Sequence, residues 1–341
     1  MKAAVFKGKG LIDTQEVLMP VCGDMDVIVK VMACGICGTD VHIFNGAEGA
    51  AATTPPVILG HEFAGIVEEV GAKVKDIKIG DRVAVDPNDT CGNCYYCKNG
   101  LAHFCQNMKG YGTTTDGGFA QYCVVNYKQI YKLADKVSFE EGAMCEPLAC
   151  CLHGIDLCEI KPGYRVMVIG GGTIGLIMVQ LAKMRGAAKI ILLEPVGEKR
   201  AIGAKLGADI VIDPIHEDVE KVLAKNNIEQ IETVIECVGL KSTMLDAIKF
   251  AGKNSVAMLF GLGNPDDEIP IKPFEIFRKE VTIKASYINP YTQGRAVSLI
   301  NSGKIDVKSL ISGTISLDEL RDTLSDPSKR QKGKVMVNPW C

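Results

Sequence analysis

The pattern of hydrophobic and polar positions changes near residue 155. Before that point, short stretches rich in β-branched and aromatic residues alternate with turns that contain Gly, Pro and Asp. These stretches predict strands at residues 26–34, 62–71, 81–87 and 119–126. We therefore expect the N-terminal part to form a mostly antiparallel, partly barrel-like β domain.

After residue 155, almost entirely apolar segments alternate with helical ones. Strands are predicted at 165–170, 188–194, 209–213, 232–239, 255–261 and 280–288, and helices near 173–186, 197–206 and 241–250. This alternation is typical of a parallel doubly wound sheet that is covered on both faces. Past about 291 we expect a helix at 295–303, another near 317–325 and a final strand at 334–338. The charged run 328–334 is interpreted as a solvated turn.

Length and composition limit the functions to consider. The 341 residues exceed the usual size of one hydrophobic core, so two domains are expected. The net charge of −3 argues against a nucleic-acid or anionic-membrane partner. The first residues lack the apolar run of a signal peptide, and no stretch reaches about 18 apolar residues. Fourteen cysteines without an export signal indicate a reducing compartment, so we expect a cytoplasmic protein.

Four cysteines lie within 15 residues of one another, separated by gaps of two, two and seven residues: Cys91, Cys94, Cys97 and Cys105. Such spacing can enclose one tetrahedral ion in a small lobe, as closed Cys₄ zinc sites do. Gly92 and the nearby Gly and Asn residues allow the sharp turns that this requires. Four thiolates also bind Fe–S clusters, but the common cluster spacings differ. The pattern favours a structural zinc.

Three glycines, Gly170, Gly172 and Gly175, follow the apolar strand at 165–170 and precede a predicted helix. They fit the G-x-G-x-x-G frame of dinucleotide sites. Its first glycine permits a tight turn, its second lets the backbone approach a pyrophosphate, and its third allows close helix–strand packing. The N-terminus of the helix offers free N–H groups and a positive dipole end to the phosphates.

Glu194 ends the next predicted strand, 19 residues beyond Gly175. A carboxylate at this position can accept hydrogen bonds from both ribose hydroxyls and would repel a 2′-phosphate. We therefore expect NAD rather than NADP, although Lys199 or Arg200 nearby could soften the discrimination.

A third group of candidate residues lies in the first domain, in the segments 37–42, 60–62 and 145–147. It supplies a thiolate, imidazoles and carboxylates, which are the ligands of a catalytic zinc with one open position. Two of the five histidines of the chain fall in these segments, which weakens the alternative that His61 is a core histidine. Cys34 competes with Cys37 as the thiol ligand, but it lies at the end of a predicted strand, whereas Cys37 lies in the turn.

Together these features resemble the zinc-containing medium-chain dehydrogenase/reductase superfamily over essentially the whole chain. The Gly60-His61-Glu62 and Glu146-Pro147-Leu148 motifs look like the polyol (sorbitol-type) branch, and residues 37–43 are similar to bacterial L-threonine dehydrogenases. The resemblance implies a GroES-like catalytic domain, at 1–154 and 291–341, and a Rossmann NAD-binding domain at 155–290.

The resemblance also assigns roles to individual residues. Cys37, His61 and Glu62 would bind the catalytic zinc, with Glu146 as a further ligand or exchange partner, and Thr39 and His42 would relay the proton. Cofactor contacts would come from the glycine loop, the ribose carboxylate and later loops: Gly170, Gly172, Thr173, Ile174, Gly175, Glu194, Lys199, Gly261, Gly263, Ser286 and Tyr287. The loop 46–56 would border the substrate pocket.

The expected activity is hydride transfer between NAD and a secondary alcohol, most simply a polyol or sugar alcohol that becomes a ketone. Zinc would lower the pKa of the substrate hydroxyl. L-Threonine 3-dehydrogenase or another secondary alcohol or diol dehydrogenase is the enzymatic alternative. A catalytically silent NAD-binding protein is a third, because a fold does not by itself give a function. We also expect a homodimer or homotetramer.

Overall fold

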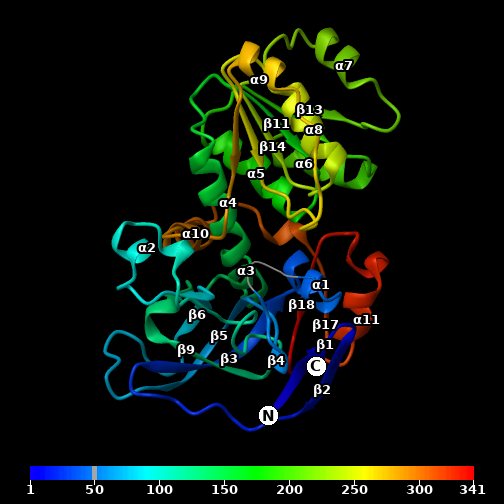
Figure 1. The fold of residues 1–341 in the computed structure, drawn as a ribbon. Helices are drawn as coiled ribbons and strands as arrows, with labels where there is room; N and C mark the ends of the chain where they lie inside the picture. The colour runs from blue at the N-terminus through cyan, green and yellow to red at the C-terminus, as the bar shows by residue number, and fades with distance from the viewer. Residues whose placement is uncertain (48–51) are drawn as a thin grey trace. The chain divides into compact units, whose positions relative to one another are not determined.

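The computed structural model describes residues 1–47 and 52–341 (Figure 1). Residues 48–51, within the expected substrate-pocket loop, lie outside the described residues. The chain forms two units. Unit 1 comprises Met1–Ala149 and Ile288–Cys341, and unit 2 comprises Cys150–Tyr287. The divisions fall at 149/150 and 287/288, a few residues before the positions expected from the sequence.

Unit 2 contains one sheet in which all six strands run parallel, in the order β13-β12-β11-β14-β15-β16. The strands are β11 (Arg165–Ile169), β12 (Lys189–Leu193), β13 (Ile210–Ile212), β14 (Thr233–Glu236), β15 (Val256–Leu259) and β16 (Thr282–Ala285). This order is that of a Rossmann fold, and it confirms the predicted doubly wound sheet. β14 and β16 are shorter than the apolar runs suggested.

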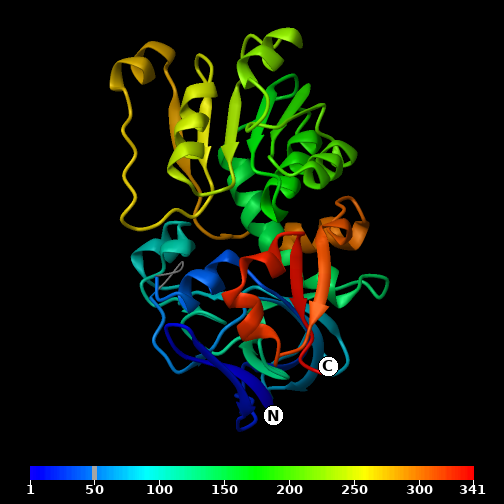
Figure 2. The same cartoon turned by 90° about the vertical axis from the view of Figure 1, so that its right-hand side faces the viewer.

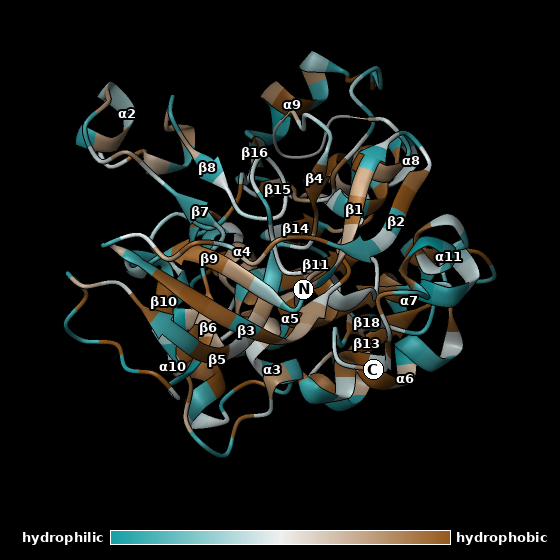
Figure 3. Cartoon of the chain, turned by 90° about the horizontal axis from the view of Figure 1, so that it is seen from below, coloured by the Kyte–Doolittle hydropathy of each residue, from teal (hydrophilic) through white to brown (hydrophobic). Residues whose placement is uncertain are grey.

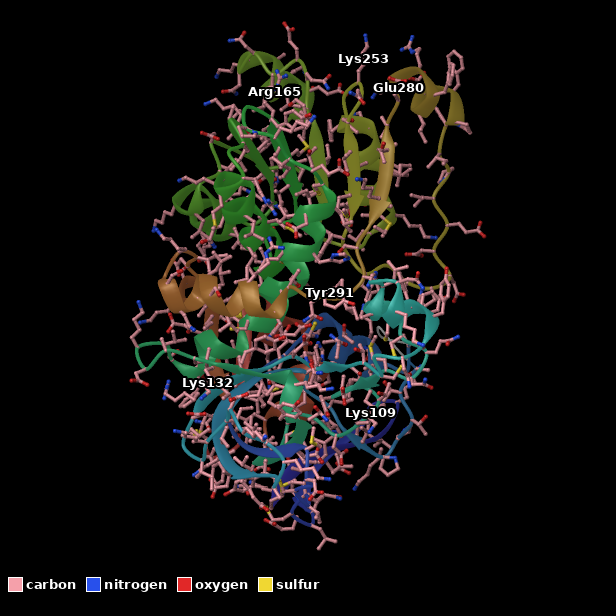
Figure 4. All side chains as sticks on the ribbon, turned by 90° about the vertical axis from the view of Figure 1, so that its left-hand side faces the viewer. Lys109, Lys132, Arg165, Lys253, Glu280 and Tyr291 are labelled. Atoms are coloured by element: carbon pink, nitrogen blue, oxygen red, sulfur yellow. The ribbon has the colours of Figure 1, made fainter. Side chains whose placement is uncertain are left out.

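Helices cover both faces of this sheet (Figures 1 and 2). They are α5 (Thr173–Met184), α6 (Gly197–Leu206), α7 (Val219–Lys225), α8 (Lys241–Phe250) and α9 (Pro273–Lys279). Figure 4 labels Arg165, Lys253 and Glu280, which lie at the amino ends of three strands and gather at one edge of the sheet. The carboxyl ends, where open α/β sheets bind their ligands, therefore face the opposite edge.

The larger sheet of unit 1 contains seven strands. At its centre β3 (Asp26–Gly35) pairs antiparallel with β5 (Glu62–Val70), β9 (Tyr122–Asn126) and β18 (Lys334–Val337). The outer strands are β6 (Arg82–Val85), β10 (Ile130–Lys132) and β17 (Ile311–Ile315). Figure 3 colours much of β3 and β9 brown, as hydrophobic, and their buried side chains line the core of the unit. This is the expected GroES-like β domain.

The C-terminal segment completes that sheet, because β18 pairs with the end of β3 next to the turn at Cys37. The run 328–334 is therefore only partly a turn. Pro327–Arg330 forms a short 3₁₀ helix, and Lys334 begins a strand and is buried. The interpretation of the whole run as solvated was wrong at Lys334, since the charged residues before it concealed the start of the strand.

The remaining elements of unit 1 are short. A small sheet consists of β1 (Lys2–Gly8), β2 (Leu11–Glu16) and β4 (Val57–Ile58), and β7 (Asn88–Asp89) pairs with β8 (Lys109–Gly110). The helices are α1 (Gly38–Phe44), α2 (Tyr95–Lys98), α3 (Phe139–Ala143), α10 (Gln293–Ser302) and α11 (Leu320–Ser325). Helix α4 (Cys145–Leu157) begins in unit 1 and continues into unit 2. Every helix in 1–47 and 52–341 is too short or too polar to cross a bilayer.

Candidate active site

Three candidate metal ligands meet in unit 1. Ligand atoms of Cys37, His61 and Glu62 all lie within 4.8 Å of one another. Cys37 precedes α1, and His61 and Glu62 stand at the start of β5, whose first residues pair with the end of β3. The sheet register therefore brings the turn after β3 next to the first residues of β5.

Asp40 orients two members of this cluster. Its Oδ2 accepts a hydrogen bond from the backbone N–H of Cys37 at 2.8 Å, which fixes the first turn of α1. Its Oδ1 lies 3.4 Å from Nδ1 of His61, an ion-pair contact rather than a hydrogen bond, which leaves Nε2 as the nitrogen available to a metal. Burial alone would lower the pKa of His61, but the negative charges of Asp40 and Cys37 outweigh it and raise the pKa. Asp40 lies within the segment 37–42, but nothing in the sequence indicated that it would contact the candidate ligands.

Lys334 is a second residue of the site that the sequence did not indicate. Its Nζ lies 2.7 Å from both carboxylate oxygens of Glu62 and donates a further hydrogen bond to the carbonyl of Ile36 at 3.0 Å. Both side chains of the ion pair are buried, with 7% and 1% exposure. Burial by itself would lower the pKa of Lys334, yet the charges of Glu62 and Cys37 raise it. Glu62 is thus held by a cation on one side.

The chemistry of the cluster fits a zinc ion. Cys37, Glu62 and Asp40 are three acidic groups in or beside one largely buried site, and Lys334 is the cation paired with Glu62. Buried charges are normally paired or coordinate a metal. One thiolate, one imidazole and one carboxylate are a usual donor set for catalytic zinc, which keeps a further position for water or substrate. These residues can therefore hold zinc.

Helix α1 also carries the two expected relay residues. Thr39 and His42 are three positions apart, so they share one face of the helix, and both are half-buried. Cys34, the alternative thiol, lies within β3 and is fully buried. Burial raises its pKa well above the ordinary thiol value, and the charges of Asp40 and Glu62 act in the same direction. Cys34 does not belong to the three-residue cluster.

Glu146 lies in the first turn of α4, which begins at Cys145. The side chain is buried, with 7% exposure, and its charge helps to raise the pKa of Lys334. It is not among the three residues whose ligand atoms converge within 4.8 Å. The structure thus places Glu146 in the electrostatic surroundings of the cluster.

The four cysteines of the lobe at 91–105 also converge, with their sulfur atoms within 4.8 Å of one another. Cys105 Sγ lies 3.5 Å from Cys91 Sγ and 4.0 Å from Cys94 Sγ. Backbone N–H groups of the turn donate to Cys91 and lower its pKa to about 6, which favours the thiolate that a metal requires. Helix α2 begins after Cys94, and Figure 1 shows it in cyan. All fourteen cysteines of the chain are free thiols.

The glycine loop of unit 2 has the geometry that its motif predicts. Gly170 has a φ of +98°, and a Cβ at Gly175 would collide with the Gly170 carbonyl, so neither position suits a side chain. Gly172 caps α5, and a Cβ placed there would meet no atom within 4 Å. Thr173 and Ile174 form the first turn of that helix. The loop therefore leaves room for a phosphate at the helix N-terminus.

Glu194 holds this loop in place. It follows β12, is buried with 5% exposure, and accepts hydrogen bonds from the backbone N–H groups of Gly171 at 2.6 Å and Val196 at 2.8 Å. Each carboxylate oxygen has two lone pairs, so both can still accept a ribose hydroxyl. Lys199 lies one turn into α6, which follows directly.

The other expected cofactor residues lie at the carboxyl ends of β15 and β16. Gly261 packs so closely on Gly239 and Glu236 that a side chain would not fit, and a Cβ at Gly263 would lie 3.0 Å from the side chain of Met244. Ser286 and Tyr287 follow β16, and no hydrogen-bond partner of the buried Ser286 hydroxyl is found in the part of the chain that the structure describes. These residues lie on the ligand-binding edge of the sheet, like the glycine loop.

Comparison with known proteins identifies the family. Residues 23–135 match the model of the alcohol dehydrogenase GroES-like domain, and residues 173–302 match that of the zinc-binding dehydrogenase. The chain belongs to the zinc-containing medium-chain dehydrogenases. It is a zinc-dependent oxidoreductase whose cofactors are zinc and a nicotinamide dinucleotide, as the resemblance implied.

Relatives of this dehydrogenase cover nearly its whole length. It is 33% identical to sorbitol dehydrogenase of Bacillus subtilis (strain 168), over 99% of this chain and 97% of the relative. It is 36% identical to L-threonine 3-dehydrogenase of Pyrococcus furiosus, over 87% and 86%. A zinc-binding dehydrogenase from Sinorhizobium meliloti 1021, solved bound to NADP, is 40% identical with a TM-score of 0.94, and 99% of each chain is covered.

Proposed function

We propose that this dehydrogenase oxidises a secondary alcohol of a polyol or sugar alcohol to the ketone, with NAD as the hydride acceptor. The observation that carries the proposal is the convergence of Cys37, His61 and Glu62, the complete donor set of a catalytic zinc. A catalytically silent relative would be expected to have lost one of these ligands. The polyol class is supported by the sorbitol dehydrogenase relative.

Each residue of the site has a defined part in this reaction. Zinc held by Cys37, His61 and Glu62 would lower the pKa of the substrate hydroxyl. The bound nicotinamide would serve as the hydride acceptor, and the proton of the substrate hydroxyl would then have to be removed. Thr39 can pass that proton through its hydroxyl. His42 can take it up, since an imidazole nitrogen can accept a proton.

NAD is the proposed cofactor because the buried carboxylate of Glu194 can accept bonds from the adenosine ribose and would repel a 2′-phosphate. We expect Lys199, in α6, to contact the same end of the nucleotide. In Glu194→Ala, the ratio of kcat/KM for NAD to that for NADP should fall. Because Glu194 also holds Gly171, part of the loss with NAD will come from a looser loop. A wild-type preference for NADP would contradict the assignment.

A substrate panel tests the activity. Zinc-replete enzyme is assayed for NAD reduction with sorbitol and other polyols, 2,3-butanediol, L-threonine and simple alcohols, with Cys37→Ser as the inactive control. Turnover of polyols supports the proposal. Turnover of L-threonine alone would instead assign the activity of the Pyrococcus furiosus relative. No turnover with any secondary alcohol would overturn the dehydrogenase assignment altogether.

We also propose that the enzyme works in the cytoplasm as a homodimer or homotetramer. Fourteen free thiols suit a reducing compartment. β16 ends the parallel sheet and leaves one edge without a partner strand among the described residues, which favours pairing with a second copy.

A further inference from the structure

Arg200 bridges the carboxyl ends of two neighbouring strands, at the edge of the sheet where we expect the adenosine half of the nucleotide to bind. It lies in the first turns of α6, and its Nη1 donates to the backbone carbonyls of Glu194 and Pro195, at 2.7 Å each. The same nitrogen lies 3.1 Å from Oδ2 of Asp213, the residue that follows β13. The guanidinium is therefore fixed between the carboxyl ends of β12 and β13.

Asp213 is itself fixed by its own turn. Its side chain is 12% exposed, and Oδ1 accepts a hydrogen bond from the backbone N–H of Ile215 at 3.0 Å. Oδ2 lies 3.1 Å from the exposed imidazole of His216 as well as from Arg200. The pKa of Asp213 is lowered, because these hydrogen bonds and the charge of Arg200 outweigh the effect of burial. Asp213 is thus a well-anchored carboxylate that faces the guanidinium.

This arrangement affects whether a phosphate on the 2′-oxygen of the adenosine ribose can be bound. Arginine is the side chain best suited to a phosphate group, since it presents a planar fork of donors. Here the guanidinium lies beside Glu194, the residue expected to bind the ribose hydroxyls, yet its charge is balanced by Asp213 and one of its nitrogens is occupied by backbone carbonyls.

We propose that Asp213 is a specificity-determining residue that prevents Arg200 from binding the 2′-phosphate of NADP, so that NAD is preferred to NADP. The proposal rests on the proposed NAD preference and deepens it. Glu194 repels the phosphate directly, whereas Asp213 acts by holding and neutralising the nearby cation. The NADP-bound relative from Sinorhizobium meliloti 1021 shows that this fold can also accept the phosphorylated nucleotide.

The test is direct binding of NADH and NADPH, followed by nucleotide fluorescence, which needs neither substrate nor turnover. Asp213→Asn keeps the side-chain volume and an oxygen that can accept from Ile215, but it removes the charge. We expect the variant to bind NADPH about fivefold more tightly or better, equivalent to about 1 kcal/mol. NADH affinity should stay within about twofold, because this nucleotide has no phosphate for Arg200 to bind.

Two controls test whether the change in NADPH affinity comes from the charge of Asp213 and depends on Arg200. Asp209→Asn removes the same charge at the amino end of β13, far from the nucleotide edge, and should change neither affinity. In Asp213→Asn/Arg200→Met, the gain for NADPH should disappear. A gain that persists without Arg200, or no gain in Asp213→Asn, would overturn the proposal.

The outcome stays interpretable if a variant is unstable or if the proposed cofactor is wrong. Should Asp213→Asn fail to fold, Asp213→Ser provides an uncharged hydroxyl that can accept from Ile215 and gives the same comparison. Tighter NADPH than NADH binding in the wild type would contradict the proposed NAD preference. The role of Asp213 is judged separately, from the change in NADPH affinity between variant and wild type.

Discussion

At the scale of single residues, the candidate metal cluster depends on how its negative charges are balanced. Glu62 has 1% side-chain exposure and faces Lys334 at 2.7 Å through both carboxylate oxygens. The carboxylate would therefore be shared between Lys334 and the expected zinc. This pairing fixes Glu62 next to Cys37 and His61, and it moderates the charge that Glu62 presents to the metal.

Replacing Lys334 tests this balance. Lys334→Met keeps much of the length of the side chain but leaves a buried carboxylate without its partner, which typically costs about 3–5 kcal/mol. We expect a loss of free energy of unfolding of that order and a fall in kcat, both measured on protein of known zinc content. Lys332→Met, at an exposed position two residues away, should change neither. Wild-type stability and kcat in Lys334→Met would show that the ion pair is unimportant.

Lys334 also shows where inference from the sequence fails. The candidate ligands Cys37, His61 and Glu62 could be named from local motifs, because each motif combines a turn with a residue type that binds zinc. Lys334 lies 272 positions from Glu62 and ends a charged run that is typical of a solvent-exposed turn. Only the pairing of β18 with β3 brings it to the cluster, and no local pattern encodes that pairing.

At the scale of structural elements, the lobe around α2 is predicted to hold a zinc ion of its own. Its four sulfur ligands share no residue with the cluster around Cys37. The wild-type chain should therefore contain two zinc ions, and Cys94→Ser should retain about one, as measured by metal analysis. Cys22→Ser, which alters a thiol outside both clusters, should retain two. Two ions in Cys94→Ser would show that the lobe is not the second site.

Helix α4 allows a test of Glu146. A carboxylate in the first turn of a helix is stabilised by the helix dipole, which is a sufficient structural reason for its presence. If that were its whole role, Glu146→Gln would cost about 1 kcal/mol of stability or less and leave kcat unchanged. We expect instead that kcat falls by about an order of magnitude or more, with little change in melting temperature or NAD affinity. The reason is that the charge of Glu146 acts on Lys334, the cation paired with Glu62. An unchanged kcat would remove Glu146 from the site.

The elements themselves were predictable to different degrees. The apolar strands of unit 2 and the glycine loop have strong local signals, so both the Rossmann sheet and the turn at Gly170 followed from the sequence. The hairpin of β1 and β2 and the short helices α7 and α9 were not predicted. Their sequences are more mixed in polarity, and they are placed by packing on other elements rather than by a clear period of their own.

At the scale of the whole molecule, the free edge of β16 is expected to determine assembly. The strand is exposed at three of its four positions, including Ile283 at 37% exposure. Phe274 and Phe277 on the preceding helix α9 are 68% and 76% exposed, and their rings lie 6.4 Å apart. A strand edge without a partner strand in residues 1–47 and 52–341, together with exposed aromatic side chains on the preceding helix, favours association with a second copy.

We therefore expect light scattering to give at least twice the chain mass of 36.7 kDa. Ile283→Lys should shift the population toward monomer, because lysine on an edge strand opposes pairing with a second edge. Ile215→Lys, at a position that is 70% exposed after β13 at the other end of the sheet, is the matched control and should leave the mass unchanged. A wild-type mass of 36.7 kDa at all concentrations would refute the assembly. A dimer that both variants retain would place the interface elsewhere, since then the edge of β16 would contribute no more than an ordinary surface.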